Sequence, residues 1–297
     1  MTRGVWNRLA RAYADGGVST VVDRSLQSFF AEPRGWPTLH WRLASWYYRA
    51  NCANDVQVYS EPPDPFKLEW VDPAAIERHT RREYPPWRGR LSRFGEVLDG
   101  DWDQRDCPPT NPDYDGPPPE LFVADRFENS VLYQSLAAHF ERSVDWEETE
   151  LFVETCRLLR EGEENRVWQH CRSVSDVRKR FAYLDELYET IQREGFKSQR
   201  QLLRTDPQRG FRDWLRNEIT VDIGRDGELL LVCGKHRLTI AKLLGVERVP
   251  VLFLVRHPGW MARRESAIES DEVESHPDLR DIPAAETAPT RRVGHAR

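Results

Sequence analysis

The sequence predicts an α/β protein of the α+β type, built on one mixed sheet, and three stretches carry this prediction. Residues 219–223 and 228–233 read as two strands, because the Asp-Gly pair between them supplies the positive φ angles of a tight hairpin turn. Apolar residues then return at helical spacing over residues 238–244. Residues 249–255 resume an apolar strand. We therefore expect a compact unit of strand, hairpin, strand, helix and strand.

Residues 1–60 are expected to form a helical arm, because aromatic and aliphatic residues recur there at helical spacing. Arginines are interleaved with them, so the arm either docks a partner or a membrane surface, or packs on the domain. The arginines are spread around the expected helices, which favours packing. Residues 56–59 read as a short strand at the end of the arm.

The domain itself is expected over residues 61–261. It opens with a strand at residues 66–71, after which Asp72 and Pro73 begin a short helix. Residues 129–204 follow a helical period and form an insertion between this strand and the hairpin. Residues 262–297 are rich in Glu, Ser, Pro and Ala without an apolar period, which predicts a disordered tail.

The joint between the second hairpin strand and the helix offers the clearest chemistry. Gly234, Lys235, His236 and Arg237 place three basic side chains and the free amides of a helix N-terminus at the end of a buried strand. The helix dipole disfavours each cation in the first turn by roughly 0.3–1 kcal/mol, so three together require a counter-charge. The alternative is that Lys235 and Arg237 are solvated and that His236 is simply a polar residue before the helix. The glycine, the buried strand and the immediate helix favour a phosphate-binding site.

Gly-Lys-His-Arg, followed by residues 238–245, resembles the signature helix of the ParB and sulfiredoxin-like superfamily. In that superfamily a Gly-x-(His/Arg)-Arg stretch lies against the phosphates of a bound nucleotide. The resemblance implies a ParB/sulfiredoxin-like mixed sheet with a helical insertion and an N-terminal arm. It also implies that Gly234, Lys235, His236 and Arg237 bind the phosphates of a nucleotide such as ATP, ADP or CTP.

The signature departs from both branches of the superfamily. Sulfiredoxins carry a catalytic cysteine between the glycine and the histidine, where this chain has Lys235, and Cys233 lies two residues upstream. Partition-type ParB proteins have an acidic residue and an arginine where Lys235 and His236 stand, which leaves Arg237 as the direct match. The nucleotide site is therefore carried over, but neither reaction is.

An acidic loop at residues 94–103 is the second feature of chemical interest. Its carboxylates Asp101 and Asp103 could hold a magnesium ion or serve as a catalytic general base. The alternative is an acidic surface turn anchored by Trp102. We expect Asp101 and Asp103 to face Lys235 and Arg237 across one cleft, with a metal-nucleotide complex between them.

The composition limits the classes of function. The net charge of -6 does not favour a nucleic-acid partner, which normally requires a basic surface. Five scattered cysteines without a Cys-x-x-Cys pair indicate neither a disulfide framework nor a zinc site. No apolar run approaches the roughly 18 residues of a transmembrane helix, so a cytoplasmic location is expected.

The leading functional hypothesis is a nucleotide-dependent enzyme, a magnesium-dependent phosphotransferase or NTPase that acts on an unknown small-molecule substrate. Some members of the resembled superfamily are small-molecule kinases. The alternatives are a DNA-associated partition-type or nuclease protein, and a noncatalytic nucleotide-binding regulator whose N-terminal arm docks a partner. The first alternative would need a DNA-binding surface that the acidic composition does not favour.

Overall fold

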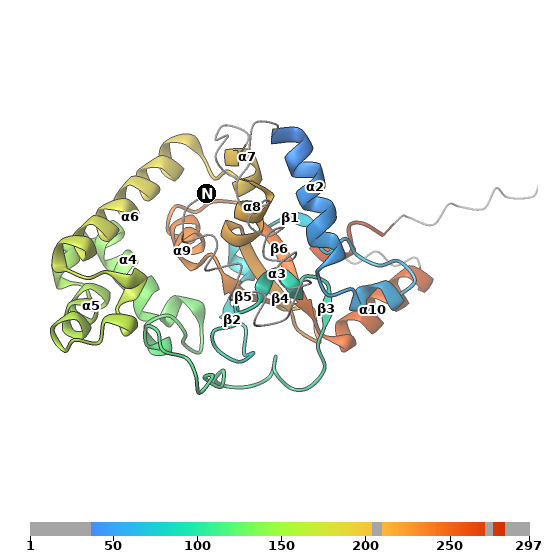
Figure 1. Ribbon diagram of the computed structural model, residues 1–297, viewed down its shortest axis with the longest axis horizontal. Coiled ribbons are helices and arrows are strands. Elements are labelled where there is room, and N and C mark those ends of the chain that lie inside the picture. The colour runs from blue at the N-terminus through green and yellow to red at the C-terminus, as the bar shows by residue number, and fades with distance from the viewer. Residues whose placement is uncertain (1–36, 204–209, 271–275, 283–297) are drawn as a thin grey trace, which may run out of the picture.

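The computed structural model describes residues 37–203, 210–270 and 276–282, and these residues form a mixed α/β structure around one sheet (Figure 1). The sheet has six strands in the order β1-β6-β4-β5-β2, with β3 paired to β6 outside this path. Their bounds are β1 Leu68–Val71, β2 Arg78–His79, β3 Glu96–Val97, β4 Ile219–Ile223, β5 Leu229–Cys233 and β6 Val249–Arg256. The predicted hairpin, its two strands and the strand after the helix are therefore confirmed.

β6 is the centre of the sheet. It pairs antiparallel with β1 and parallel with β3 and β4, while β5 pairs antiparallel with β4 and parallel with β2. All eight residues of β6 are buried, as expected of a strand covered on both faces. The alternating sequence of β4 predicts one solvated face, but Thr220 and Asp222 are buried too. Asp222 is tolerated there because it forms an ion pair with Arg82 at 2.6 Å.

The helices are α2 Pro37–Ala50, α3 Arg90–Arg93, α4 Val131–Arg142, α5 Glu150–Arg160, α6 Val174–Glu194, α7 Gln199–Leu203, α8 Phe211–Asn217, α9 Lys235–Leu243 and α10 Pro258–Ser270. Helices α4, α5 and α6 form the predicted insertion and lie together to one side of the sheet, with α9 between them and the strands (Figure 1). Ile240 of α9 joins their hydrophobic core. The insertion is therefore fixed to the helix that carries the expected phosphate site. None of the helices described has the length and apolar composition that crossing a bilayer requires.

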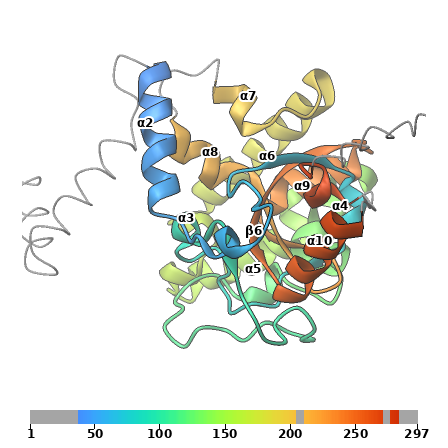
Figure 2. The ribbon, with the colours of Figure 1, turned by 90° about the vertical axis from the view of Figure 1, so that its right-hand side faces the viewer.

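The part of the arm that the structure describes is a packed helix. Helix α2 runs alongside α8 in both views (Figure 2). Trp41 stacks on Trp214 with ring centroids 5.7 Å apart, and Tyr48 stacks on Phe211 at 5.8 Å. Residues 1–36, which make up the rest of the predicted arm, lie outside the described residues.

The strand predicted at residues 56–59 is wrong, because Asp55–Val58 forms a 3-10 helix. Its first residue explains the difference. The Asp55 carboxylate accepts a hydrogen bond from the amide of Val97 at 3.1 Å, while Val56 is buried in the core. This contact ties the segment to the edge strand β3 in a helical turn.

The prediction of a disordered tail over residues 262–297 is wrong for the tail residues that the structure describes. Residues 262–270 continue α10, and a 3-10 helix at Pro277–Leu279 follows. Leu279 and Ile282 are buried in the main core, although they are separated from other apolar residues in the sequence. Two isolated apolar residues carry no periodic signal, so pattern reasoning could not detect this packing.

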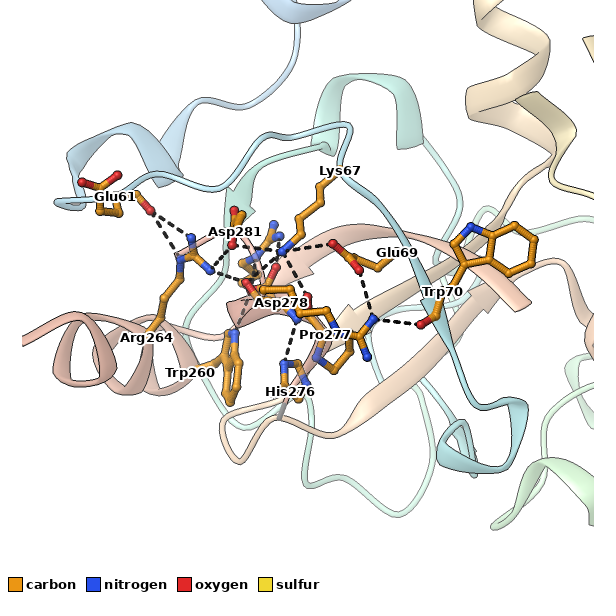
Figure 3. A network of polar contacts seen from close by, with 12 residues as sticks. Glu61, Lys67, Glu69, Trp70, Trp260, Arg264, His276, Pro277, Asp278 and Asp281 are labelled. Carbon is orange, nitrogen blue, oxygen red and sulfur yellow. Dashed lines mark hydrogen bonds and ion pairs between the residues drawn. The ribbon is translucent and has the colours of Figure 1, made fainter. Parts of the chain in front are cut away.

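Buried charges hold the C-terminal segment in place (Figure 3). The Asp278 carboxylate is completely buried and accepts hydrogen bonds from Arg256, at 2.6 and 3.0 Å, and from the Trp260 indole at 2.9 Å. Lys67, which precedes β1, donates to the carbonyl of Asp278 at 3.1 Å and to the Asp281 carboxylate at 3.0 Å. The network therefore joins the start of the domain to its end.

The charge of Asp278 depends on its partners. Burial by itself raises the pKa of this carboxyl, but the charge of Arg256 and the hydrogen bonds it donates outweigh burial and lower the pKa to about 2. Because the folded pKa lies below the ordinary value, the stabilisation is present above that value. It is lost as the pH falls toward the folded pKa.

We expect Asp278→Asn to lower the free energy of unfolding by about 3–5 kcal/mol, since it leaves the Arg256 charge buried without an anion. The matched control is Asp226→Asn, which removes an exposed ion pair with Arg263 and should cost less than about 0.5 kcal/mol. Urea unfolding of both variants at neutral pH measures the difference. Equal stabilities would show that the C-terminal segment does not support the core.

Candidate functional site

Gly234 fixes the turn from β5 into α9. Its φ angle is 95°, in the left-handed region that favours glycine. A Cβ atom at this position would lie 2.9 Å from the Cα of Ile219 in β4. A side chain would therefore collide with the neighbouring strand. Because glycine has no side chain, the chain can turn here. Helix α9 therefore begins at the end of β5, and its free amides lie at the end of the sheet.

Two cavities meet at this turn. The larger, of about 730 Å³, lies against α6, α7 and α8 and is lined by Arg180, Tyr183 and Arg237, among others. The smaller, of about 530 Å³, lies against α3 and α8 and is lined by residues that include Trp87. Both cavities are lined by Gly234, His236 and Arg216, so the N-terminus of α9 lies where they join. Both volumes are in the range of small-molecule sites.

The charged side chains around the two cavities are mostly basic. They are Arg90, Arg180, Lys197, Arg212, Arg216, Lys235 and Arg237, against the single carboxylate of Glu194. Glu194 is itself neutralised by Lys197 at 2.8 Å and by Arg193 at 3.0 Å. The cleft therefore carries an excess of positive charge within an acidic protein, which favours an anionic ligand.

Four of these arginines have no carboxylate partner among the described residues. Arg180, Arg212 and Arg216 form no ion pair with the described residues. The guanidinium of Arg90 donates a hydrogen bond to the thiol of Cys233. The Nε atoms of Arg180 and Arg212 are buried without a hydrogen-bond acceptor. Unsatisfied buried donors are costly.

Arg237 differs from these arginines, because its charge is already balanced. It lies 3.1 Å from the buried carboxylate of Glu218 and donates to the backbone carbonyl of Lys197. Burial raises the pKa of Glu218, and the charge of Arg237 opposes this effect. The expectation that only an external anion relieves the charge of Arg237 is therefore wrong, because Glu218 supplies that charge from within the fold.

Lys235 has no anionic partner among the described residues. Its amine lies 3.2 Å from the ring centroid of Phe122 and 5.6 Å from that of Trp87. Burial in these aromatic surroundings lowers the pKa of the amine to about 7. A lysine in this state loses its proton near neutral pH, whereas a solvated lysine stays charged.

Two histidines next to Lys235 are neutral. Burial lowers the pKa of His236 well below its usual range, and the charge of Lys235 lowers it further. The same two causes lower the pKa of His79, in β2, to about 3. Both ring nitrogens of His79 and the Nε2 atom of His236 are buried, and none of them has a hydrogen-bond partner among the described residues. The expected cationic turn is therefore less charged than its sequence implies.

The acidic loop lies elsewhere. Asp103 accepts hydrogen bonds from the amide of Arg225 at 2.7 Å and from its guanidinium, and Asp101 pairs with the same guanidinium at 2.8 Å. Arg225 belongs to the β4–β5 turn, whereas Lys235 follows the other end of β5, and a five-residue strand spans about 13 Å between its end residues. The expected shared cleft is therefore wrong, because the hairpin has its own cation for the acidic loop to bind.

This placement changes the roles expected of Asp101 and Asp103. Burial of Asp103 raises the pKa of its carboxyl, but hydrogen bonds from Arg225 outweigh burial and lower it, so the carboxylate is a poor general base. In the described part of the chain, no group of three or more His, Cys, Asp or Glu side chains is arranged to hold a metal ion. The two aspartates instead anchor the loop at residues 98–103 to the hairpin.

The sequence reasoning did not find the unpaired arginines. One signal was present: Arg212 and Arg216 are four residues apart on α8, directly before β4, so they share one face of that helix. Arg90 and Arg180 come from distant parts of the chain, and no local pattern links them to Gly234.

Comparison with protein-family models, curated proteins and solved structures found no match for this chain. The likeness to the ParB and sulfiredoxin-like superfamily therefore rests on residues 234–245 and on the order of elements around them.

We expect Gly234→Ala to lower the free energy of unfolding by about 2–5 kcal/mol, because it adds both backbone strain and a collision with Ile219. Gly245→Ala is the matched control. Gly245 also has a positive φ angle, of 63°, but an added Cβ would meet no atom within 4 Å, so that variant should cost only about 1–2 kcal/mol. Urea unfolding measures both. Equal losses would mean that the approach to β4 is not restrictive.

Proposed function

We propose that this chain binds a nucleotide, or a related phosphate-bearing small molecule, in the cleft at the N-terminus of α9. The observation that carries the proposal is the set of unpaired cations around the cleft. Arg90, Arg212 and Arg216 converge on the cavity that contains the first turn of α9, and the only lining carboxylate, in the neighbouring cavity, is already neutralised. Arginine forks and helix amides are the groups that proteins use to bind phosphates.

The aromatic residues of the cleft suit the rest of a nucleotide. Trp87 is 37% exposed in the smaller cavity, and Tyr183 is 46% exposed in the larger one. An exposed ring beside a phosphate site can stack on a base. A nucleotide with its phosphates at the junction near Arg216 would reach one of these rings.

The order of elements supports membership of the ParB and sulfiredoxin-like superfamily, which we include in the proposal. β1 is followed by the short helical turn expected at Asp72 and Pro73, in which the Asp72 carboxylate accepts a hydrogen bond from the amide of Ala74 at 2.8 Å. The hairpin, α9 and β6 follow in the expected order.

Binding without catalysis is the form of this function that the geometry favours. Asp101 and Asp103, the candidate base and magnesium ligands, are held by Arg225 at the other end of β5. A nucleotide-binding regulator needs neither group. The second candidate, a magnesium-dependent phosphotransferase or NTPase, requires that the ion arrive with the nucleotide, since magnesium often binds through substrate phosphates. The exposed Trp46 of α2 supports a docking role for the arm in the regulator.

We expect Arg216→Ala to weaken the binding of ATP, ADP or CTP by about 1.5–3 kcal/mol, roughly tenfold to a hundredfold in Kd, because a charged hydrogen bond is lost. Arg248→Ala is the matched control, since Arg248 is an exposed arginine just beyond the C-terminal end of α9. Calorimetric titration of each nucleotide, with and without magnesium, gives the affinities. If Arg216→Ala binds as tightly as the wild type, or if the wild type binds no nucleotide, the proposal fails.

We expect anion affinity to fall as the pH rises through about 7, where the Lys235 amine loses its proton. An anion binds the charged amine better than the neutral amine. Above this pKa the amine must therefore take up a proton when the anion binds, which weakens binding. Sulfate is a suitable probe because its own charge is constant from pH 5 to 9. In Lys235→Arg the cation persists at every pH in this range, so the slope should disappear. A wild-type sulfate affinity that does not change between pH 5 and 9 would contradict a role for the Lys235 amine in anion binding.

A further inference from the structure

Lys235 differs from every other lysine of the chain. The chain has five lysines. Lys67, Lys197 and Lys242 are held by carboxylates, and Lys179 is exposed to solvent. Lys235 alone among these described lysines is enclosed by aromatic rings without an acidic partner. The rings of Phe122 and Trp87 can attract the ammonium form of Lys235, but burial outweighs this attraction and lowers the pKa of the amine.

The groups that face the Lys235 amine come from several elements, and none of them is a carboxylate. His79 belongs to β2, Arg90 to α3, Cys233 to β5 and His236 to α9. Lys235 lines both a small enclosed space beside Phe122 and Tyr84 and the 530 Å³ cavity. Removal from water without a counter-ion favours the neutral amine, which is the nucleophilic form of lysine.

The 530 Å³ cavity, which Lys235 lines, also holds the cations suited to a phosphate. Arg212 and Arg216 line it from α8, and the first turn of α9 begins at Lys235 itself. A molecule that places a phosphate on these groups would bring its other end against the amine. We propose that Lys235 forms a Schiff base with a small phosphorylated aldehyde or ketone bound in this cavity.

The reaction requires no further reagent. The amine lone pair attacks the carbonyl carbon, and a carbon–nitrogen bond forms. The carbonyl oxygen takes up the two protons that the amine nitrogen gives up and leaves as water, so that an imine remains. Nothing is oxidised or reduced.

Pyridoxal phosphate tests the proposal, because it joins an aldehyde to a phosphate. The full-length chain is incubated with it at pH 7, reduced with borohydride and mapped by peptide mass spectrometry. Lys235 should be labelled at least about tenfold faster than Lys179, which is exposed to solvent. Labelling of Lys235 should level off above pH 8, because its amine has lost its proton by then. Equal labelling of the two lysines would overturn the proposal.

Three comparisons complete the test. Pyridoxal, which lacks the phosphate, should label Lys235 more slowly, and pyrophosphate should protect Lys235 from pyridoxal phosphate. Lys235→Arg should abolish the fast adduct, whereas Lys179→Ala should leave it unchanged. Equal labelling rates with the two aldehydes, or no protection by pyrophosphate, would overturn the proposal that the cavity recognises the phosphate of the ligand. The inference uses the same cleft as the proposed function but fails separately: if no nucleotide binds and Lys235 is still selectively labelled, only the nucleotide proposal is lost.

Discussion

The close approach of two backbones at Gly234 is the constraint on which the site depends. With the Cα of Ile219 only 2.9 Å from where a Cβ would lie, the chain must turn there without a side chain. This turn places the first residues of α9 at the end of β5, and α9 in turn carries the insertion through Ile240. The cleft exists because the helix starts there, between the sheet on one side and α6 on the other.

Charge is distributed unevenly in this protein. Three arginines are matched with buried carboxylates: Arg82 with Asp222, Arg256 with Asp278, and Arg237 with Glu218. Each pair offsets the cost of burying a charge, and the pair at Asp278 holds the C-terminal segment. Around the cleft this matching stops, and four arginines have no carboxylate partner among the residues that the structure describes. A bound anion would balance their charge, which is why the cleft and not the acidic loop is the site we propose.

Lys235 connects the two proposals. An amine whose pKa is lowered to about 7 can bind an anion as an ammonium or attack a carbonyl as a neutral base, depending on what occupies the cavity. A bound phosphate close to the amine raises its pKa and suppresses its reactivity. A ligand whose carbonyl reaches the amine, while its phosphate lies farther away on the arginines of α8, leaves the pKa of the amine low. The position of the phosphate relative to Lys235 therefore decides between binding and covalent reaction.

The sequence by itself determined the hairpin, the start of α9 and the central strand, because an Asp-Gly pair, a glycine and apolar periods act over a few neighbouring residues. It also located the joint at Gly234 correctly. Only the tertiary structure decided which charges are free. Asp103 pairs with Arg225 across 122 positions, and Arg82 with Asp222 across 140, so no local pattern reveals that these acids are already used. Arg237 and Lys235 look alike in the sequence, but the carboxylate of Glu218 balances the charge of the first, whereas burial between aromatic rings lowers the pKa of the second.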